Sequence, residues 1–364
     1  MCLSYNCYNI TQSFVKAGWL NVLTTLWLYC ENEYTSSWPV LNVYCYQLTS
    51  IVKEIVIMSG QQDKDSEFDE QLLLPFTYVY QMPGKAMRKR IGESFNHWLH
   101  VPQDKLEEVI EIVGMYHHCT LIADDVQDNT KHRRGIPAAH TVYGMPITVN
   151  AANHVMMLVL EKCMQLHEKG ALIFREQTIQ MLRGQGKEIY WRDNFICPTE
   201  DQYMTHLTQK TGDMFLFCFR LLQLFSDSTI DYSGFVRKLG MYFQLRDDYC
   251  NICQPKALEE CSPVTNENAG EFYDDLTEGN FTLPIIHAAN TAGGKIVLNI
   301  LRQKTHDISL KKYCKSLLEQ GGSLQYTRDV MNNLDYSLRD EIARFGGNPP
   351  LVAVLDEMLS WRDA

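Results

Sequence analysis

The stretch Leu121-Ile122-Ala123-Asp124-Asp125-Val126-Gln127-Asp128-Asn129 decides how the rest of the chain is interpreted. The apolar run before it, 106–121, repeats at three- and four-residue steps, which is typical of a helix. On a helix Asp128 lies about 40° and Asp125 about 100° round from Asp124, so three carboxylates can reach one point in space. Like charges this close repel each other. The pattern therefore indicates a bound divalent cation, and oxygen ligands favour Mg²⁺ over zinc.

A second cluster of the same kind strengthens this interpretation, because a single acidic triplet is more often a solvated helix end. Leu245-Arg246-Asp247-Asp248-Tyr249-Cys250-Asn251 closes the apolar stretch 235–244. Its Asp247, Asp248 and Asn251 repeat the angular positions of the first three acids. We expect the two clusters to face each other across a cavity and to hold several Mg²⁺ ions against one polyphosphate.

Composition limits the function classes. The 364 residues are 45% hydrophobic with a net charge of −11, which suits one large domain or two small ones. No basic stripe with interleaved aromatic residues is present, which argues against nucleic acid as a partner. Twelve cysteines are scattered, and the single Cys250-x-x-Cys253 pair lacks the further ligands of a zinc site. Reduced thiols are typical of a cytoplasmic protein, which is the location we expect.

Residues 1–57 differ from the rest of the chain. They are rich in Tyr, Trp, Cys, Asn and Thr, and the uncharged segment Ala17–Cys30 is too short for a membrane span. The character changes abruptly at Met58. We interpret Met58 as the usual start and 1–57 as an atypical extension of a domain formed by 58–364. A membrane-associating N-terminal hairpin is the alternative.

From Phe68 onward the pattern is helical, and no alternating strand pattern of useful length occurs. The fold class is therefore all-α, a bundle of ten or more helices around a central cavity. A polar loop is expected at 254–271, with further helices to the C-terminus. The predicted helices before this loop are Glu70–Gln81, Lys85–Leu99, Asp104–Asp128, Pro137–His167, Leu172–Arg192, Glu200–Phe225 and Tyr232–Cys253.

Basic residues that could bind a diphosphate occur at helix starts or beside the acids. Lys85 and Arg88 share one helix face near a helix start, where backbone N–H groups also favour anions. His97 lies about 180° round from Arg88, so a kink would be needed to bring it to the same place. Arg133-Arg134 follow the first cluster, and Lys210-Thr211 sit in a long apolar helix. Solvated surface patches are the alternative for each pair.

Glu188 follows Gln185 by three residues, so the two share a helix face. Glu188 is therefore a candidate for a further metal ligand. Its alternative role is that of a surface partner for Arg192, four residues on.

These stretches carry a resemblance. The chain resembles the trans-isoprenyl diphosphate synthases, and most closely the animal geranylgeranyl diphosphate synthases, over about residues 65 to 355. The motifs are Pro83-Gly84-Lys85-x-x-Arg88, Phe95-Asn96-His97-Trp98, Asp124-Asp125-x-x-Asp128 with Arg133-Arg134-Gly135, Gly184-Gln185-Gly186, Tyr190-Trp191-Arg192-Asp193, Gln209-Lys210-Thr211-Gly212, Phe243-Gln244-x-Arg246-Asp247-Asp248-Tyr249-x-Asn251 and Asp275-Leu276-Thr277-Glu278-Gly279.

The resemblance implies a chain-elongating prenyltransferase that forms at least a dimer and uses three Mg²⁺ ions. An allylic diphosphate ionises and isopentenyl diphosphate attacks the resulting cation. The implied metal ligands are Asp124, Asp125, Asp128, Asp247, Asp248 and Asn251, with Glu188 as the added candidate. The implied contacts to isopentenyl diphosphate are Lys85, Arg88, His97 and Arg134. The implied contacts to the allylic diphosphate are Arg133, Lys210, Thr211 and Gln244. Ionisation would fall to Asp124, Asp125, Lys210 and Asp247.

Several positions depart from the family pattern. Asn280 stands where a lysine is usual, and Asp213 where glycine is usual. The stretch His117-His118-Cys119-Thr120 replaces the commoner His-Asn-Ala-Ser, and Tyr116 could form a floor to the cavity. The loop 254–271 also looks longer and altered.

The departures keep an alternative open, a terpene synthase that converts geranyl or farnesyl diphosphate to a volatile terpene without condensation. The retained basic residues for isopentenyl diphosphate favour condensation. A non-catalytic, ion-binding helical protein is a third possibility. Product chain length does not follow from the sequence, although the small Cys119 and Thr120 leave room for products longer than fifteen carbons.

Overall fold

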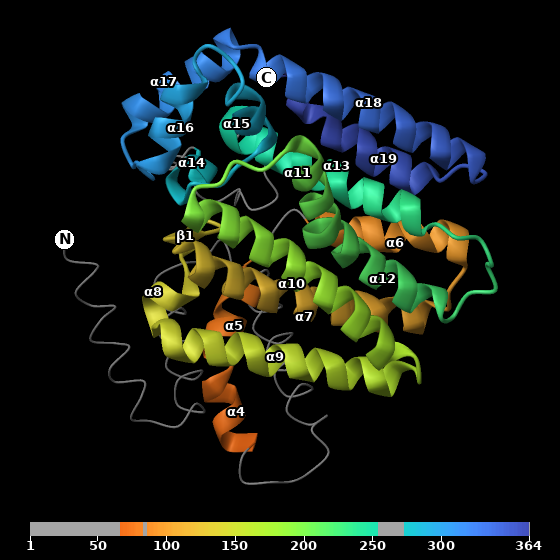
Figure 1. The fold of residues 1–364 in the computed structure, drawn as a ribbon. Coiled ribbons are helices and arrows are strands. Elements are labelled where there is room, and N and C mark those ends of the chain that lie inside the picture. Colours follow the sequence, from red (N-terminus) through yellow and green to blue (C-terminus); the bar gives the residue numbers. More distant parts are fainter. Residues whose placement is uncertain (1–65, 83–85, 254–272, 364) are drawn as a thin grey trace, which may run out of the picture. The chain divides into compact units, whose positions relative to one another are not determined.

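The computed structural model describes residues 66–82, 86–253 and 273–363, which apart from the first residue of α4 belong to the compact unit Glu67–Ala364. Within these ranges every regular element except one short hairpin is helical, which confirms the predicted all-α bundle (Figure 1). The predicted extension 1–57 and the polar loop 254–271 lie outside the described residues. None of the described helices is long and apolar enough to cross a membrane.

The helices before the second acid cluster follow the predicted stretches closely. The predicted helix Pro137–His167 is divided in two because Gly144, with a φ of 92°, interrupts it. The elements are α4 (Ser66–Leu72), α5 (Leu74–Tyr80), α6 (Met87–Leu99), α7 (Gln103–Asp128), α8 (Ala139–Tyr143), α9 (Met145–Leu166), α10 (Gly170–Asn194), α11 (Glu200–Leu207), the π-helical turn η1 (Thr208–Gly212), α12 (Asp213–Gln223) and α13 (Ser233–Cys253).

The C-terminal part adds further helices, of which α14, α15 and α18 contact α13. Figure 1 shows α18 running beside α13, with α19 next to it, and α13 and α18 are in contact. The elements are α14 (Asp274–Glu278), α15 (Leu283–Ala288), α16 (Gly294–Arg302), α17 (Ile308–Gln320), α18 (Ser323–Arg344), α19 (Pro349–Met358) and the 3₁₀ turn η3 (Leu359–Asp363).

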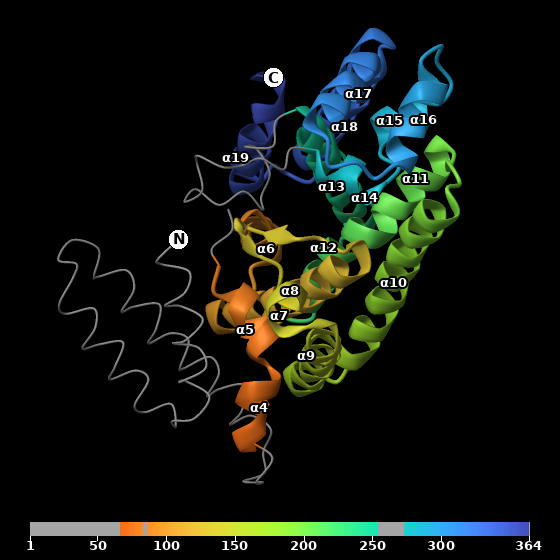
Figure 2. The ribbon, with the colours of Figure 1, turned by 90° about the vertical axis from the view of Figure 1, so that its left-hand side faces the viewer.

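Helix α7 is the centre of the first half, and it packs against α5, α6, α9 and α12. Figure 2 shows these four helices grouped around it. Its Val109, Ile112 and Ile122 are at most 1% exposed. Each such side chain contributes about 1.5–3 kcal/mol on burial, so α7 is held firmly and its acidic end is fixed in space.

The turn η1 interrupts the predicted helix Glu200–Phe225 and lies between α10 and α13. Single π-helical turns often occur at functional sites, and this one carries Lys210. A Cβ atom on Gly184 of α10 would lie 2.7 Å from the backbone nitrogen of Lys210. On the other side, a Cβ atom on Gly240 of α13 would lie 2.5 Å from the Gly212 Cα. The three elements are therefore in direct backbone contact.

A hairpin follows the first acid cluster and was not predicted. Strand β1 (His132–Arg133) pairs antiparallel with β2 (Ile136–Pro137). Its turn residues Arg134 and Gly135 have φ values of 53° and 81°, the left-handed pattern of a tight two-residue hairpin. Strands of two residues leave no alternation in the sequence to detect.

Candidate active site

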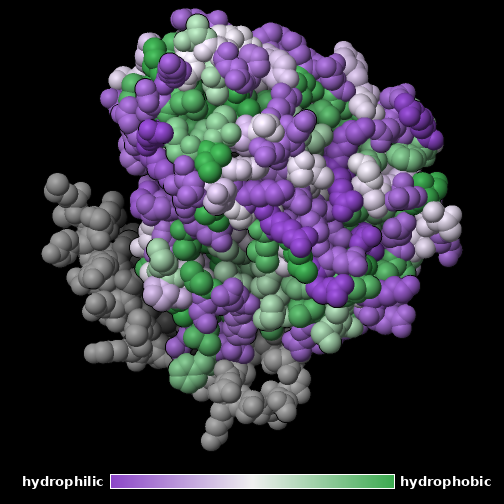
Figure 3. All heavy atoms as spheres, viewed as in Figure 1, coloured by the Kyte–Doolittle hydropathy of each residue, from purple (hydrophilic) through white to green (hydrophobic). Residues whose placement is uncertain are grey.

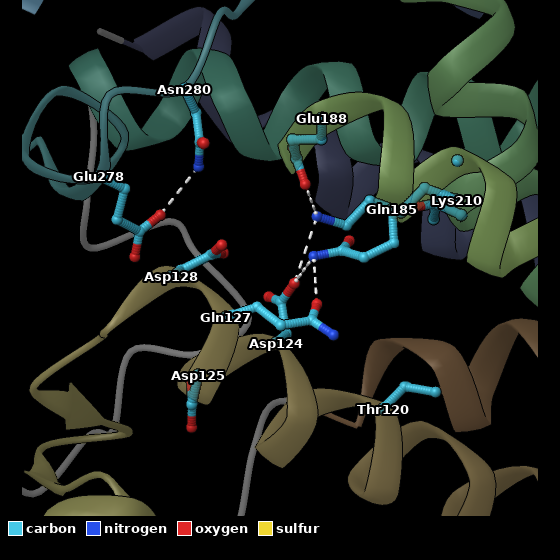
Figure 4. Close-up of polar contacts among 12 residues, drawn as sticks. Thr120, Asp124, Asp125, Gln127, Asp128, Gln185, Glu188, Lys210, Glu278 and Asn280 are labelled. Atoms are coloured by element: carbon cyan, nitrogen blue, oxygen red, sulfur yellow. Dashed lines mark hydrogen bonds and ion pairs between the residues drawn. The ribbon is translucent and has the colours of Figure 1, made fainter. Parts of the chain in front are cut away.

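The three acids of the first cluster are not equivalent. The side chain of Asp124 is 26% exposed and faces a cavity. Its Oδ1 accepts a hydrogen bond from Gln185 Nε2 at 2.7 Å, and Lys210 Nζ lies 3.5 Å away. Figure 4 shows these three side chains converging from three different elements. Asp124 is thus the acid of this cluster best placed to meet a ligand.

Asp125 points away from that group (Figure 4) and is 1% exposed. Its Oδ1 accepts a hydrogen bond from Arg133 Nε at 2.8 Å and also contacts Nη2 of the same guanidinium. A buried carboxylate paired in this way stabilises the position of its partner. The geometry therefore has Asp125 holding Arg133, and its role as a metal ligand stays a prediction.

Asp128 is held from the other side by Arg192, and both side chains are at most 5% exposed in this ion pair. Arg192 Nη2 also donates to the backbone oxygen of Gln127 at 3.0 Å. Burial, followed by the charge of Asp124, raises the pKa of Asp128 to about 7. Arg192 therefore holds a largely buried acid at this end of the site, and sequence reasoning missed its role.

Glu188 lies inside the site, and the expected surface pairing with Arg192 is not what the structure shows. It pairs with Lys210, and its Oε1 lies 3.5 Å from His206 Nε2. Burial acts to raise its pKa, but Lys210 and His206 outweigh burial and bring the pKa below its ordinary value. Sequence reasoning also missed His206, a residue 2% exposed whose Nδ1 lies 3.0 Å from the Gly184 carbonyl oxygen.

The second cluster divides its roles in a similar way. Asp247 lines the same cavity as Asp124. Asp248 is 9% exposed and accepts hydrogen bonds from Tyr203 Oη and, at 2.9 Å, from Gln244 Nε2. Burial raises the pKa of Asp248 to about 6. Asp247 is therefore the counterpart of Asp124, and Asp248 anchors the surrounding side chains.

Helix α14 adds two acids that the sequence reasoning did not assign, Asp275 and Glu278. Burial, followed by nearby carboxylates, raises the pKa of both well above the ordinary value. Asn251, predicted as a metal ligand, instead accepts a hydrogen bond from the backbone nitrogen of Asp275 at 3.3 Å. Asn280 is 6% exposed and donates to Glu278 Oε2 at 3.0 Å (Figure 4). The position of the usual lysine is thus filled by a neutral partner of an acid.

The acid-lined cavity has a volume of about 200 Å³. Thr211 and Gln244 form its polar wall together with Lys210, and Thr211 Oγ1 donates to Gln244 Oε1 at 2.8 Å. The apolar wall consists of Leu121, Met156, Met181, Leu182 and Met214. Polar groups at one end and an apolar wall beyond them suit a diphosphate ester with a hydrocarbon tail.

Tyr116 lines the apolar part of this cavity and is 1% exposed. Its Oη donates to Thr178 Oγ1 at 2.9 Å, and its ring centroid lies 5.0 Å from that of Phe217. Thr120 also lines the cavity, while Cys119 is fully buried and contacts the Tyr116 carbonyl oxygen. The geometry is that of a rigid aromatic floor at Tyr116.

A second cavity of about 520 Å³ is lined by Arg88, His117, His118 and Arg134. Arg88 and His117 line the acid-lined cavity as well, so the two spaces share a wall. Burial, followed by the charge of Arg88, lowers the pKa of His117 well below its ordinary value. The buried His117 Nε2 has no hydrogen-bond partner among the described residues.

One predicted contact needs correction and one cannot be placed. Helix α6 runs without a kink from Met87 to Leu99 and leaves His97 exposed, so His97 does not join Arg88. His117 occupies the shared wall instead, and it was identified only as part of a divergent stretch. Lys85 lies outside the described residues.

Asp213, which stands where glycine is usual, does not line the cavity that contains Asp124 and Lys210. Its side chain is 2% exposed and its Oδ1 accepts a hydrogen bond from Arg237 Nε at 2.9 Å. The extra carboxylate is thus neutralised by an arginine of α13.

The donor set fits Mg²⁺. Asp124, Asp128 and Asp247 offer carboxylate oxygens, the ligands that Mg²⁺ prefers. Among the described residues no three acidic, His or Cys side chains are grouped closely enough to hold a metal ion alone. Phosphate oxygens of a substrate would complete the coordination, as is common for Mg²⁺. The fold and site are those expected of a helical, magnesium-dependent enzyme that binds diphosphates.

Comparison with known proteins gives the family. The family model described as Polyprenyl synthetase matches residues 69–318, and the chain belongs to this family. A protein of Matsumurasca onukii named "Terpene synthase" is 48% identical over 299 residues, 82% of this chain and 96% of that protein. Proteins named "Geranylgeranyl pyrophosphate synthase" from Mucor circinelloides f. lusitanicus and Dictyostelium discoideum are 39% and 38% identical, covering 81% and 80% of this chain and 95% and 93% of theirs.

Proposed function

We propose that this protein is a prenyltransferase that joins isopentenyl diphosphate to an allylic prenyl diphosphate and releases a longer prenyl diphosphate of the geranylgeranyl type. The observation that carries the proposal is the pair of cavities that share Arg88 and His117. The first contains Asp124, Asp247, Lys210 and Arg133 together with an apolar wall, and the second contains Arg88 and Arg134. Synthases of this family use these two substrates and in general depend on Mg²⁺.

The allylic diphosphate would occupy the acid-lined cavity. Mg²⁺, of which we propose three ions held by Asp124, Asp128 and Asp247, supplies positive charge that stabilises the departing diphosphate. Lys210 and Arg133 add fixed positive charge, and Thr211 and Gln244 orient the same group. The C1–O bond breaks with its electron pair passing to the diphosphate, and the allylic cation points toward Tyr116.

Isopentenyl diphosphate would be held in the second cavity by Arg88 and Arg134, beside His117 Nε2, which has no hydrogen-bond partner among the described residues. Its double bond then lies next to C1 of the allylic cation and forms the new carbon–carbon bond. A proton is lost from the resulting cation to the released diphosphate. Because protein nucleophiles take no part, positioning and charge account for the catalysis.

A terpene synthase is the second candidate function, and two observations favour it. The relative from Matsumurasca onukii is more similar to this chain than the two geranylgeranyl pyrophosphate synthases compared with it. In addition, Asn280 removes a cation from the allylic end of the site. The second cavity argues the other way, since its Arg88 and Arg134 suit a second diphosphate, which ionisation without condensation does not need.

One assay separates the two functions. The purified full-length chain is incubated with Mg²⁺ and geranyl or farnesyl diphosphate, with and without isopentenyl diphosphate, and both volatiles and prenyl diphosphates are analysed. We expect longer prenyl diphosphates only when isopentenyl diphosphate is present. Volatile hydrocarbons from the allylic substrate alone would favour the terpene synthase. Asp124→Ala is the control for background hydrolysis in both arms.

We also propose that the protein is at least a homodimer. Helices α9 and α10 carry exposed hydrophobic side chains, among them Met157, Met164 and Leu182 at 54–61% exposure. Figure 3 shows hydrophobic patches over these two helices. A patch on two adjacent helices suits a second copy of the same surface. Light scattering on wild type and Leu182→Arg tests this.

The boundary at Met58 stays a proposal too, and mass spectrometry of the native N-terminus tests it.

A further inference from the structure

Arg134 is held in an unusual backbone conformation. It occupies the first turn position of the β1–β2 hairpin with a φ of 53°, and it is only 6% exposed. A non-glycine residue in the left-handed region is strained, and the strain persists only where the surroundings fix it. The contacts of the Arg134 side chain therefore matter for where its charge points.

Two acceptors fix the guanidinium through one nitrogen. Arg134 Nη1 donates to the backbone oxygen of Met82 at 2.8 Å and lies 3.1 Å from His118 Nε2. These two bonds use both hydrogens of Nη1 and come from different parts of the chain, α7 and the segment after α5. Together they hold the guanidinium in the wall of the second cavity.

The protonation of His118 follows from its two partners. His118 Nδ1 lies 2.8 Å from the backbone oxygen of Gly114, which can only accept, so Nδ1 carries the hydrogen. Arg134 can only donate, so Nε2 must be the accepting nitrogen. Tyr80 packs against the edge of the ring at a centroid distance of 4.7 Å. A neutral imidazole with hydrogen on Nδ1 satisfies both hydrogen bonds at once.

We propose that His118 is a positioning residue that aims Arg134 at the diphosphate of isopentenyl diphosphate, an inference that rests on the proposed function. An asparagine is commoner at this position in the family. The amide group of an asparagine extends about as far from the backbone as the ring Nδ1 does. It can therefore keep the Gly114 contact but does not extend to Arg134. The histidine of this chain therefore supplies a second anchor that the shorter side chain lacks.

The alternative is that His118 only fills space against Tyr80, and three matched variants separate the two roles. His118→Phe keeps the ring packing and removes both hydrogen bonds. His118→Asn keeps an acceptor and donor near Nδ1 and removes the Arg134 contact. His118→Gln places an amide oxygen near the former Nε2, where it can accept from Arg134.

The readout is the pair of KM values measured in the full-length enzyme. We expect His118→Phe and His118→Asn to raise KM for isopentenyl diphosphate by about three- to tenfold, with KM for the allylic substrate unchanged. His118→Gln should lie close to wild type. Equal KM increases for both substrates, or a His118→Gln enzyme as impaired as His118→Phe, would overturn the proposal. Unfolding temperatures of all three variants identify any loss of fold.

Arg134→Ala shows which of the two claims has failed. A large rise in KM for isopentenyl diphosphate in Arg134→Ala together with unchanged His118 variants contradicts the positioning role alone. A wild-type enzyme without saturable dependence on isopentenyl diphosphate contradicts the proposed function and this inference together.

Discussion

Replacing Asn280 by lysine restores the charge that the family usually places beside the allylic diphosphate, but the structure predicts that the single change achieves little. Asn280 Nδ2 lies 3.0 Å from Glu278 Oε2, so a lysine ammonium there would pair with Glu278. Burial, followed by the charge of Asp128, raises the pKa of Glu278 well above its ordinary value. A lysine ammonium beside this carboxyl would favour its ionised form, and the two opposite charges would cancel.

The gain in affinity for the allylic diphosphate depends on whether the carboxylate that cancels the lysine charge is removed. A hydrogen bond to a charged group contributes roughly 1.5–3 kcal/mol, and each 1.4 kcal/mol is about tenfold in affinity. We expect Asn280→Lys alone to lower KM for the allylic diphosphate by about threefold or less. In Asn280→Lys combined with Glu278→Gln the ammonium has no carboxylate partner, and KM should fall by about tenfold or more.

The assay is the dependence of initial rate on farnesyl diphosphate at saturating isopentenyl diphosphate and fixed Mg²⁺. Asn280→Gln and Glu278→Gln serve as matched controls that add no charge. A single Asn280→Lys variant that gains as much as the double variant would refute the pairing with Glu278. A double variant with wild-type KM would refute the placement of residue 280 beside the allylic diphosphate.

Three further predictions follow from the site. Asp124→Ala should lower turnover at least about 100-fold because it removes the cavity-facing carboxylate, while circular dichroism should show an unchanged helical content; activity close to wild type would contradict the metal site. Tyr116→Ala should shift products to longer prenyl chains, seen by mass spectrometry, whereas Tyr116→Phe keeps the floor and the product; identical products from both would contradict the floor. In metal-free protein, the raised pKa of Asp248, about 6 against 3.8, means that the folded state binds the proton more tightly. Its contribution to stability is present at low pH and is lost as pH rises through about 6, so melting temperatures of wild type should fall across this range more than those of Asp248→Asn.

The sequence predicted the helices well because burial leaves a periodic trace. Helix α7 was expected at Asp104–Asp128 and occurs at Gln103–Asp128, since its apolar residues face a core on several sides. The interruption at η1 left no such trace. A π-helical turn adds one residue to a turn, and the Lys210-Thr211 motif carries no local feature that signals it.

The candidate site was predictable as a set of residues but not as a set of partners. Two acids predicted to bind metal, Asp125 and Asp248, contact Arg133 and Tyr203, and the sequence predicted neither partner. Such pairings join residues that are not neighbours in the chain, and the periodicity of apolar residues does not indicate them. The position of His97 could be predicted from the sequence, because a straight helix with a 100° step places it opposite Arg88.

The contact of η1 with α10 and α13 has a consequence for how such enzymes diversify. Substituents on Gly184 or Gly240 would collide with backbone atoms, so the spacing between Lys210 and the helix that carries Asp247 has little freedom to drift over generations. The lining at Tyr116 and Thr120 is side chain only and can change without moving that spacing. New hydrocarbon products can therefore arise by mutation while the machinery that releases diphosphate is inherited intact.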